Sequence, residues 1–215
     1  MFLLFIFNIN NKYIIIVMKK YFYNNDEFIE CGIDEAGRGP LFGNVYAAVV
    51  ILDQNLIIPE NLIIDSKKLS KKKRKIAFDW IKENIKNYGI GFATNEEIDK
   101  INILEATKLA MERAINNLPI KPTHFIIDGA GWEKKFNDLN VLSVVKGDNL
   151  YYSIAAASIL AKEYHDEHIR NICIENELLN KYDLLNNMGY GTKKHIDAIK
   201  LHGYTGYHRK SFSIS

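Results

Sequence analysis

The run from Tyr46 to Leu52 constrains the fold of this chain most, because it is apolar at every position. A strand with one face in water alternates apolar with polar residues, whereas a strand buried on both faces is apolar throughout. The run therefore predicts a strand at the centre of a sheet. Residues 28–33 predict a second strand, joined to the first through a glycine-rich turn.

The remainder of the chain mixes helical and strand patterns. Thr94 with Glu97 and Asn102 with Glu105 have the spacing of helix N-caps, and the second pair predicts the start of a helix. In order, the patterns predict a helix at 71–87, a short strand after Gly89, a helix from 102 to 118, strands at 125–127 and 141–145, and a helical stretch from 153 to about 179. This order indicates an α/β core with a helical C-terminal part.

Composition bounds the class of protein. The chain has 215 residues, of which 47% are hydrophobic, so one globular domain with one sizeable core is expected. A formal net charge of +2 is too small to indicate nucleic-acid binding by itself. Cys31 and Cys173 have no partner at metal-ligand spacing, and we expect both to be reduced core residues.

The N-terminal residues lie outside the core pattern. Residues 1–17 are apolar, but polar residues such as Asn8 and Lys12 interrupt them, and a membrane-spanning helix needs about 20 mostly apolar residues. We expect neither a membrane segment nor a signal peptide, with Met18 as an alternative start and a cytoplasmic location. The predicted division is an extension at 1–27 and a folded domain at 28–215.

Three acidic residues follow strand-like apolar runs: Asp34, Asp128 and, after Val144-Val145-Lys146-Gly147, Asp148. If those strands are parallel, their carboxyl ends share one edge of the sheet, where α/β proteins commonly place their sites. Carboxylates so gathered repel one another unless cations neutralise them, and oxygen ligands select hard ions such as Mg²⁺ or Mn²⁺. A pair of such ions suits displacement at phosphorus. The alternative is that these residues are ordinary turn formers at strand ends.

Glu35 adds a carboxylate beside Asp34 but poses a geometric difficulty. Adjacent residues of a regular strand point to opposite faces, so Glu35 shares a site with Asp34 only if the strand ends there. Gly32 before the pair, and Gly37 and Gly39 after it, supply the required backbone freedom. Together these residues predict a metal-dependent nuclease centred on Asp34 and Glu35.

From about Glu30 to Phe212 the chain resembles the ribonuclease HII family, the type 2 ribonucleases H. The order and spacing of several segments carry the resemblance: Gly32-Ile33-Asp34-Glu35-Ala36-Gly37-Arg38-Gly39-Pro40, Asp65-Ser66-Lys67-Lys68-Leu69-Ser70, Ile127-Asp128-Gly129, Val145-Lys146-Gly147-Asp148, Ala155-Ala156-Ala157-Ser158-Ile159-Leu160-Ala161-Lys162 and Gly189-Tyr190-Gly191-Thr192.

The resemblance implies a ribonuclease H-like fold, a five-stranded mixed sheet flanked by helices. It implies an acidic quartet of Asp34, Glu35, Asp128 and Asp148 that holds two Mg²⁺ or Mn²⁺ ions, with Asp166 as a fallback for the fourth member. The implied substrates are RNA–DNA hybrids and DNA duplexes that contain ribonucleotides, cut to leave 5′-phosphate and 3′-hydroxyl ends. The resemblance also implies a role in ribonucleotide excision repair and DNA replication, and a monomer is expected.

The resemblance also assigns substrate recognition. It places the backbone of Gly37, Arg38 and Gly39 against the ribose 2′-hydroxyl, and Tyr190 on the adjoining deoxyribose. Close approach of main chain to a sugar leaves no room for a Cβ, which explains two glycines. The alternative for Tyr190 is a buried aromatic between turn glycines.

Basic residues leave several interpretations open. Lys67 and Lys68, within a family segment, are the best candidates for phosphate contact in a run that is otherwise consistent with a solvated surface. Met188 stands where the family often has lysine, and Lys193, Lys194 or His195 are candidate replacements. For His208 and Arg209, phosphate contact and a purely structural role are equally consistent with the sequence.

Two other functions are compatible with parts of this pattern. One is a two-metal nuclease of the same fold that acts on DNA junctions; Gly37, Arg38 and Gly39 with Tyr190 argue against it. The other is a nucleic-acid-binding module without catalysis, which predicts a missing carboxylate, and none of the four is missing.

Overall fold

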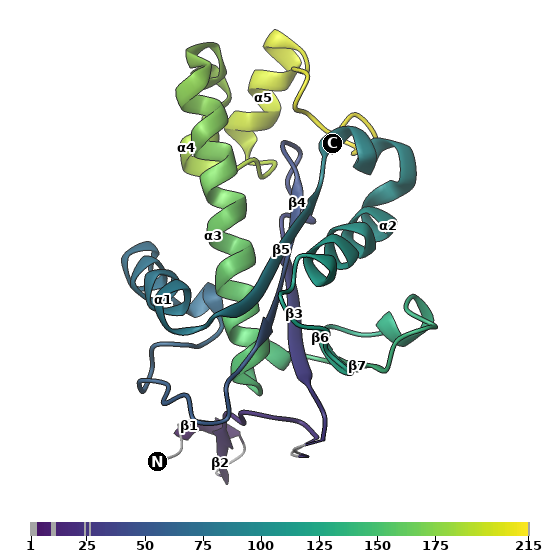
Figure 1. The fold of residues 1–215 in the computed structure, drawn as a ribbon. Helices are drawn as coiled ribbons and strands as arrows, with labels where there is room; N and C mark the ends of the chain where they lie inside the picture. The colour runs from purple at the N-terminus through teal and green to yellow at the C-terminus, as the bar shows by residue number, and fades with distance from the viewer. Residues whose placement is uncertain (1–3, 10–11, 24, 26, 215) are drawn as a thin grey trace.

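The computed structural model describes residues 4–9, 12–23, 25 and 27–214. A five-stranded sheet forms its centre, in the order β5-β4-β3-β6-β7 (Figure 1). The strands are β3 (Glu30–Ala36), β4 (Val45–Ile51), β5 (Asn87–Ala93), β6 (His124–Asp128) and β7 (Val141–Val144). β3 pairs antiparallel with β4 and β4 with β5, whereas β3 with β6 and β6 with β7 are parallel. The expected mixed sheet is confirmed.

Strand β4 is buried at every position, which the apolar run of its sequence predicts. Its alternate residues enter two different cores. Ala48 and Val50 pack with α1 (Lys71–Asn84) and α3 (Tyr152–Glu175), while Ala47 and Val49 pack with α2 (Asn95–Asn116). Figure 1 shows α1 and α3 on one side of the sheet and α2 on the other.

Helix α2 begins earlier than the sequence indicates. Thr94 and Glu97 form a complete capping box, in which each side chain accepts the other residue's backbone N–H. The second cap is also present, because Asn102 Oδ1 accepts the N–H groups of Leu104 and Glu105. Asn102 has a φ of 66°, outside the helical region, so two helical segments meet at a kink there and the second begins at Asn102, as its sequence predicts.

The other boundaries shift by a few residues. Helix α1 ends at Asn84, because β5 begins at Asn87, and α3 ends at Glu175. The chain continues through 3-10 helix η4 (Glu177–Tyr182), α4 (Leu184–Asn187) and α5 (Lys193–His202). This helical C-terminal part packs on the end of α3 and on Phe42 through a core of its own. Short 3-10 helices η1 (Ser66–Lys68), η2 (Trp132–Lys134) and η3 (Gly147–Asn149) complete the fold.

The residues before β3 contact the sheet domain. Strands β1 (Leu4–Ile9) and β2 (Lys12–Val17) form an antiparallel hairpin. Met18 is buried in the core beside α1 and α3, and Lys19 exchanges backbone hydrogen bonds with the segment around Tyr151. Within the described ranges, no helix has the length and apolarity needed to cross a membrane.

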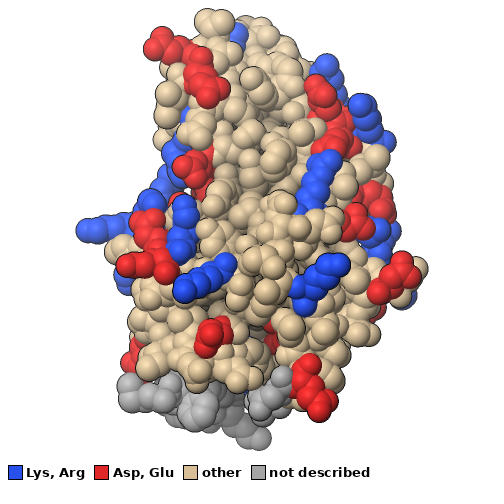
Figure 2. All heavy atoms as spheres, viewed as in Figure 1, with Lys and Arg blue, Asp and Glu red and all other residues tan. Residues whose placement is uncertain are grey.

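Charged side chains are interspersed on the face seen in Figure 2. Lys and Arg lie between Asp and Glu over this face rather than in one large basic patch. This distribution agrees with the small formal charge of +2.

Close packing of α2 on β5 depends on glycine. A Cβ added at Gly91 would lie 2.2 Å from the carbonyl oxygen of Ala110, which is helix backbone and cannot move aside. We therefore expect Gly91→Ala to lower the free energy of unfolding by about 1–3 kcal/mol or more, as overpacking does. Urea unfolding measures this. Gly206→Ala is the control, because no described atom lies within 4 Å of its added Cβ, and equal stability of the two variants would contradict the packing argument.

Candidate active site

Asp34, Asp128 and Asp148 lie at one edge of the central sheet. Strands β3, β6 and β7 run parallel, so their carboxyl ends point the same way. Asp34 lies near the end of β3, Asp128 is the last residue of β6, and Asp148 lies in η3 just beyond β7. The sheet thus brings together the three carboxylates that the sequence places after separate strands.

Crowding and burial make this edge electrostatically unfavourable for bare carboxylates. Burial, followed by the charges of Glu35 and Asp128, raises the pKa of Asp34 well above its ordinary value. Burial, followed by the charges of Asp65 and Asp128, raises the pKa of Asp148 to about 6. Because each negative charge disfavours the others, the cluster favours binding of protons or metal cations.

Hydrogen bonds from neighbouring groups orient these carboxylates. Three of them have a length of 2.7 Å: Glu35 N–H to Asp34 Oδ1, Gly147 N–H to Asp128 Oδ1, and Asn149 Nδ2 to Asp148 Oδ1. A hydrogen bond from Ser158 of α3 also favours the ionised form of Asp34. The donors are tied to the strand ends and α3, so the scaffold itself fixes the carboxylates.

Glu35 reaches the cluster by a route that the sequence does not predict. The expectation that the strand ends at the Asp34–Glu35 pair is wrong, because β3 continues to Ala36. The last register pair between β3 and β6 is Ile33 with Ile127, so Glu35 lies beyond the end of β6. Burial raises the pKa of Glu35, and the charges of Arg38, Asp128 and Lys67 also act on it.

Lys67 brings positive charge to the cluster. It lies in η1, where its backbone N–H donates to Asp65 Oδ1 at 2.9 Å. Burial lowers the pKa of Lys67, but the charges of Asp34, Asp148, Asp65 and Asp128 together raise it above its ordinary value. Its ammonium therefore lies within electrostatic reach of the cluster. Neighbouring Lys68 donates to Asn149 Oδ1, next to Asp148.

The donor set fits a hard divalent cation. All its ligand atoms are carboxylate oxygens, and the buried Glu35 Oε2 has no hydrogen-bond partner among the described residues. In the same described ranges, no three Asp, Glu, His or Cys side chains enclose a single point closely enough to form a cage. An open site agrees with Mg²⁺, which keeps several waters and takes one or two carboxylates together with substrate phosphates.

Gly37 and Gly39 have different structural causes. Gly37 has a φ of +91°, and a Cβ there would lie 2.4 Å from Cδ2 of the buried His165 ring. Packing inside the protein therefore requires glycine at Gly37. At Gly39 an added Cβ would only reach ordinary contact with the ring of Tyr190, at 3.5 Å, so the protein itself leaves space on the outer side of this residue.

Tyr190 lies beside Gly39 and is not a buried aromatic, since 42% of it is exposed. Lys162 Nζ lies 5.6 Å from the centre of its ring. Arg38 joins this surface to the carboxylates, because its guanidinium pairs with Glu35 at 3.3 Å. The residues named for metal binding and for sugar recognition thus form one continuous surface.

Two expectations about polar residues are wrong. Asp166 is no fallback for the acidic quartet, because its carboxylate is buried and accepts hydrogen bonds from Arg74, Lys162 and His165. His195 cannot replace a phosphate-binding lysine, because it is buried and bonded within the protein. Lys193 and Lys194 are exposed on α5.

His208 and Arg209 are also buried, which decides between the two readings of the sequence. Neither side chain is exposed, and Arg209 donates to carbonyl oxygens from Gly37 to Asn44. Sequence analysis left these roles open, since a basic C-terminal motif is equally consistent with phosphate contact.

The comparison with protein families decides the classification. A sequence model of the ribonuclease HII family matches residues 31–214. The chain belongs to the ribonuclease HII family. Its curated relatives include ribonuclease HII of Phocaeicola vulgatus, 47% identical over 192 residues, which is 89% of this chain and 92% of that protein. Ribonuclease HII of Rickettsia canadensis is 48% identical over 92% of this chain and 94% of its own length.

Solved structures agree with this assignment. Ribonuclease H2 of Pyrococcus horikoshii is 28% identical, with a TM-score of 0.65 over 85% of this chain and 93% of that one. Ribonuclease HII of Archaeoglobus fulgidus, solved in complex with PCNA, has a TM-score of 0.69 at 21% identity, over 87% and 96% of the two chains, and shows the likeness of fold alone. This ribonuclease HII chain therefore has the ribonuclease H-like fold and is a metal-dependent endoribonuclease.

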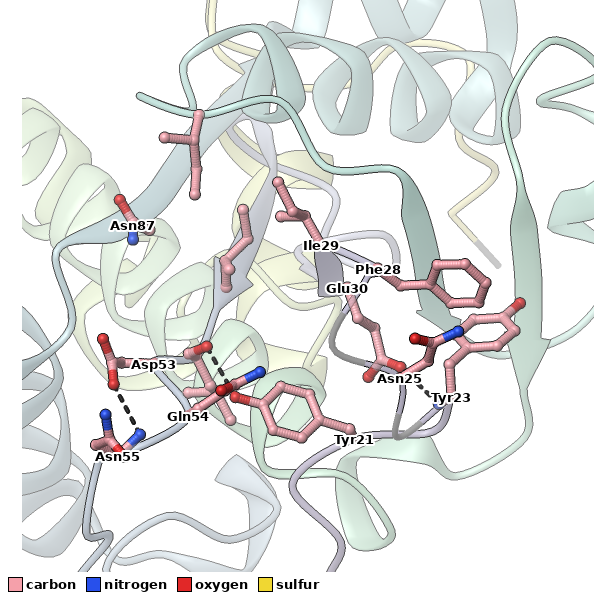
Figure 3. Close-up of a pocket in the computed structure, with 13 residues that line it drawn as sticks. Tyr21, Tyr23, Asn25, Phe28, Ile29, Glu30, Asp53, Gln54, Asn55 and Asn87 are labelled. Atoms are coloured by element: carbon pink, nitrogen blue, oxygen red, sulfur yellow. Dashed lines mark hydrogen bonds between the residues drawn. The ribbon is translucent and has the colours of Figure 1, made fainter.

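A pocket of about 670 Å³ lies away from Asp34, Asp128 and Asp148. Figure 3 shows that Tyr21, Tyr23, Glu30 and Asp53 are among its lining residues. Glu30 begins β3, so this pocket is at the opposite end of the strand from Glu35. The Glu30 carboxylate already accepts hydrogen bonds from the backbone N–H groups of Phe22 and Tyr23. The pocket therefore contributes nothing to the site described above.

Metal binding should couple to pH. Asp148 has a pKa of about 6 in the fold and about 3.9 in an unfolded chain. The folded protein therefore binds more protons between these values, and the ionised cluster destabilises the metal-free fold above about pH 6. Mg²⁺ should raise the Tm at pH 8, by the equivalent of ~2.7 kcal/mol at a hundred times Kd.

This stabilisation should shrink as the pH falls through 6, because protons then compete for the same oxygens. Thermal unfolding with titrated Mg²⁺ at pH 8, 7, 6 and 5 measures the effect. Asp148→Asn is the matched variant and should gain less Tm from Mg²⁺ at pH 8. A gain that is equal at pH 8 and pH 5 would contradict metal binding by these carboxylates.

Proposed function

We propose that this enzyme cleaves the RNA strand of RNA–DNA hybrids and incises 5′ to ribonucleotides embedded in duplex DNA. The products are 5′-phosphate and 3′-hydroxyl ends. One observation carries the proposal: the carboxylate cluster is continuous with a surface where Gly39 lies beside the exposed Tyr190. A hydrolytic centre and a group suited to a sugar thus face the same substrate.

Asp34, Glu35, Asp128 and Asp148 are the proposed ligands of two Mg²⁺ or Mn²⁺ ions. Such ions, when bound, supply a Lewis acid and an activated water for displacement at phosphorus. The protein's own contribution is to hold the carboxylates ready at the strand ends. Ribonuclease HIII from Bst has been solved in complex with Mn²⁺. It has the same fold, with a TM-score of 0.64 at 19% identity over 86% of this chain and 67% of that one.

Recognition of the ribose is proposed for Gly37, Arg38 and Gly39. Only RNA has a 2′-hydroxyl, which both donates and accepts hydrogen bonds, so backbone groups at a fixed position can detect it. Tyr190 offers an exposed aromatic face for the adjoining deoxyribose. Lys67, beside the carboxylates, and Lys68 are proposed contacts to the substrate backbone, where cations favour phosphate.

Other features stay predictions that follow from this function. We predict that the protein is located in the cytoplasm, where it has access to chromosomal DNA duplexes, and that it is a monomer. We also retain the division between the N-terminal extension at 1–27 and a catalytic domain at 28–215. A DNA-junction nuclease is disfavoured because Gly39 and Tyr190 lie side by side next to the cluster.

A duplex with one ribonucleotide tests the activity directly. With Mg²⁺ or Mn²⁺, the pure enzyme should incise 5′ to the ribonucleotide and leave the all-DNA duplex intact. Asp34→Asn should lower the rate by at least about a thousandfold, because it removes a charged ligand at the centre of the cluster. Gel analysis of end-labelled strands measures both results.

Binding provides the control for this variant. Asp34→Asn should still bind the duplex without metal, as measured by fluorescence anisotropy. Turnover retained by Asp34→Asn would refute the role of Asp34. Failure of the wild-type enzyme to cut either the ribonucleotide duplex or an RNA–DNA hybrid would refute the proposed function.

Gly39→Ala tests whether a sugar approaches the outer side of the recognition segment. The fold tolerates the new Cβ, which would lie 3.5 Å from the Tyr190 ring. We expect an unchanged Tm but a fall in kcat/KM of roughly 10- to 100-fold, because a small misplacement of substrate is costly. Gly37→Ala should instead lower the Tm, since its Cβ would overlap His165. Full activity in Gly39→Ala would exclude close approach of the sugar there.

A further inference from the structure

Arg209 is a buried cation, and its hydrogen bonds to the residues that the structure describes include no carboxylate. An arginine side chain has five N–H donors, and here they reach five carbonyl oxygens of one loop. The bonds are Nε to Gly43 at 2.8 Å, Nη1 to Arg38 at 3.1 Å and to Pro40 at 2.8 Å, and Nη2 to Gly37 at 2.7 Å and to Asn44 at 3.0 Å. The loop from Gly37 to Asn44 is therefore wrapped around one guanidinium.

This arrangement sets the direction of the loop's N–H groups. In a planar trans peptide, the C=O of one residue and the N–H of the next point in opposite directions. The carbonyls of Gly37 and Arg38 point inward to Arg209, so the N–H groups of Arg38 and Gly39 point away from it. These are the backbone groups proposed to meet the 2′-hydroxyl. Arg209 thus determines which groups the segment presents to a substrate.

His208 performs the corresponding task for Tyr190. The backbone N–H of Thr205 donates to His208 Nδ1 at 2.9 Å, so the proton of the neutral ring is on Nε2. That proton is donated to His195 Nε2 at 3.0 Å, and His195 Nδ1–H in turn donates to the carbonyl of Tyr190 at 2.9 Å. Burial, followed by the charge of His195, lowers the pKa of His208 to about 4, so the ring is neutral at neutral pH.

Backbone hydrogen bonds join the two halves. Leu41 N–H donates to the carbonyl of Gly189 at 2.8 Å, and Arg209 N–H donates to the carbonyl of Leu41 at 2.8 Å. Gly43 N–H donates to the carbonyl of Tyr207 at 2.9 Å. The loop at 37–44, the turn before Tyr190 and the C-terminal segment therefore form one hydrogen-bonded unit.

We propose that the adjacent residues His208 and Arg209 are positioning residues that set Gly37–Gly39 and Tyr190 in fixed relation, so that the enzyme distinguishes a ribose from a deoxyribose. Arg209 acts through the carbonyls of the loop, and His208 acts through His195. Neither side chain touches substrate, since both are fully buried. The inference rests on the proposed function and adds the residues that make its recognition surface rigid.

Arg209→Lys tests the first arm in the inactive Asp34→Asn background. Lysine keeps the charge but has only three donors on a flexible stem, so it cannot bond five carbonyls. Anisotropy in Mg²⁺ gives the affinity for a duplex with one ribonucleotide and for the same duplex in DNA alone. We expect the ratio of these affinities to fall about tenfold, while affinity for the DNA duplex stays unchanged. Arg113→Lys, which alters an arginine that bonds Phe92 O outside the site, is the matched control.

The outcomes separate the two hypotheses. If the parent discriminates and Arg209→Lys discriminates equally well, the positioning role is overturned while the proposed function stands. If the parent itself does not prefer the ribonucleotide, recognition of the 2′-hydroxyl fails and the positioning role fails with it. Two results together support the proposal. Arg209→Lys loses the preference for the ribonucleotide in the Asp34→Asn background, and Arg209→Lys alone, with Asp34 unchanged, keeps the Mg²⁺-induced gain in Tm.

The second arm, which runs from His208 through His195 to Tyr190, is tested at its middle residue by a double-mutant cycle that also applies if Arg209→Lys does not fold. His195→Leu removes the donor to Tyr190, and His195→Asn keeps an N–H donor at the position of Nδ1. We expect His195→Leu to lower kcat/KM about tenfold, His195→Asn to recover most of this loss, and the double variant with Tyr190→Ala to be within about twofold of Tyr190→Ala alone. Losses that multiply independently would overturn the proposal, because His195 would then not act through Tyr190.

Discussion

Repulsion between buried carboxylates is the constraint on which the rest of the site depends. Like charges at the edge of β3, β6 and β7 raise the pKa of Asp34 and bring that of Asp148 to about 6. The fold offsets this cost with nearby donors and with Lys67, whose ammonium is acted on by the same carboxylates. A divalent cation bound by these oxygens would offset it further, so the proposed chemistry also relieves the repulsion.

A second buried charge is handled in the opposite way. Arg209 is fully buried, and burial lowers its pKa to about 10, so it stays protonated at neutral pH. Five backbone carbonyl oxygens accept hydrogen bonds from its guanidinium and so offset the cost of burying the charge. The carboxylate cluster is proposed to bind an exchangeable cation from solution, whereas the guanidinium is a permanent cation that organises the backbone of residues 37–44.

The sequence predicted the sheet and the convergence of Asp34, Asp128 and Asp148, because both follow from local patterns. An apolar run predicts a buried strand, and a residue that closely follows a strand in the sequence must lie near the end of that strand. The position of Glu35 was not predictable in this way. It depends on where the neighbouring strand β6 stops, which the sequence around Glu35 does not encode. Family resemblance, rather than periodicity, placed Tyr190 in the site.

Arg209 shows why the remaining part was out of reach. Its partners lie 165 to 172 residues earlier in the chain, and a pattern of apolar and polar residues does not report contacts of such separation. The prediction that His195 binds phosphate was wrong for the same reason, because it assumed that the side chain is exposed. Both residues look like surface cations in sequence and are interior donors in the fold. Burial turns a candidate phosphate-binding residue into an internal hydrogen-bond donor, and only the tertiary structure shows which basic residues are buried.

The two glycines of the recognition segment give a physical reason why such a framework is needed. Glycine permits the positive φ of Gly37, but it also gives the free loop more conformations than any other residue would. The proposed detection of one hydroxyl by this backbone is incompatible with that freedom, because loosely placed donors lose most of their selectivity. His165 fills the space behind Gly37, and Arg209 fixes the carbonyls of Gly37 and Arg38. The segment therefore gains its shape from glycine and its rigidity from distant residues.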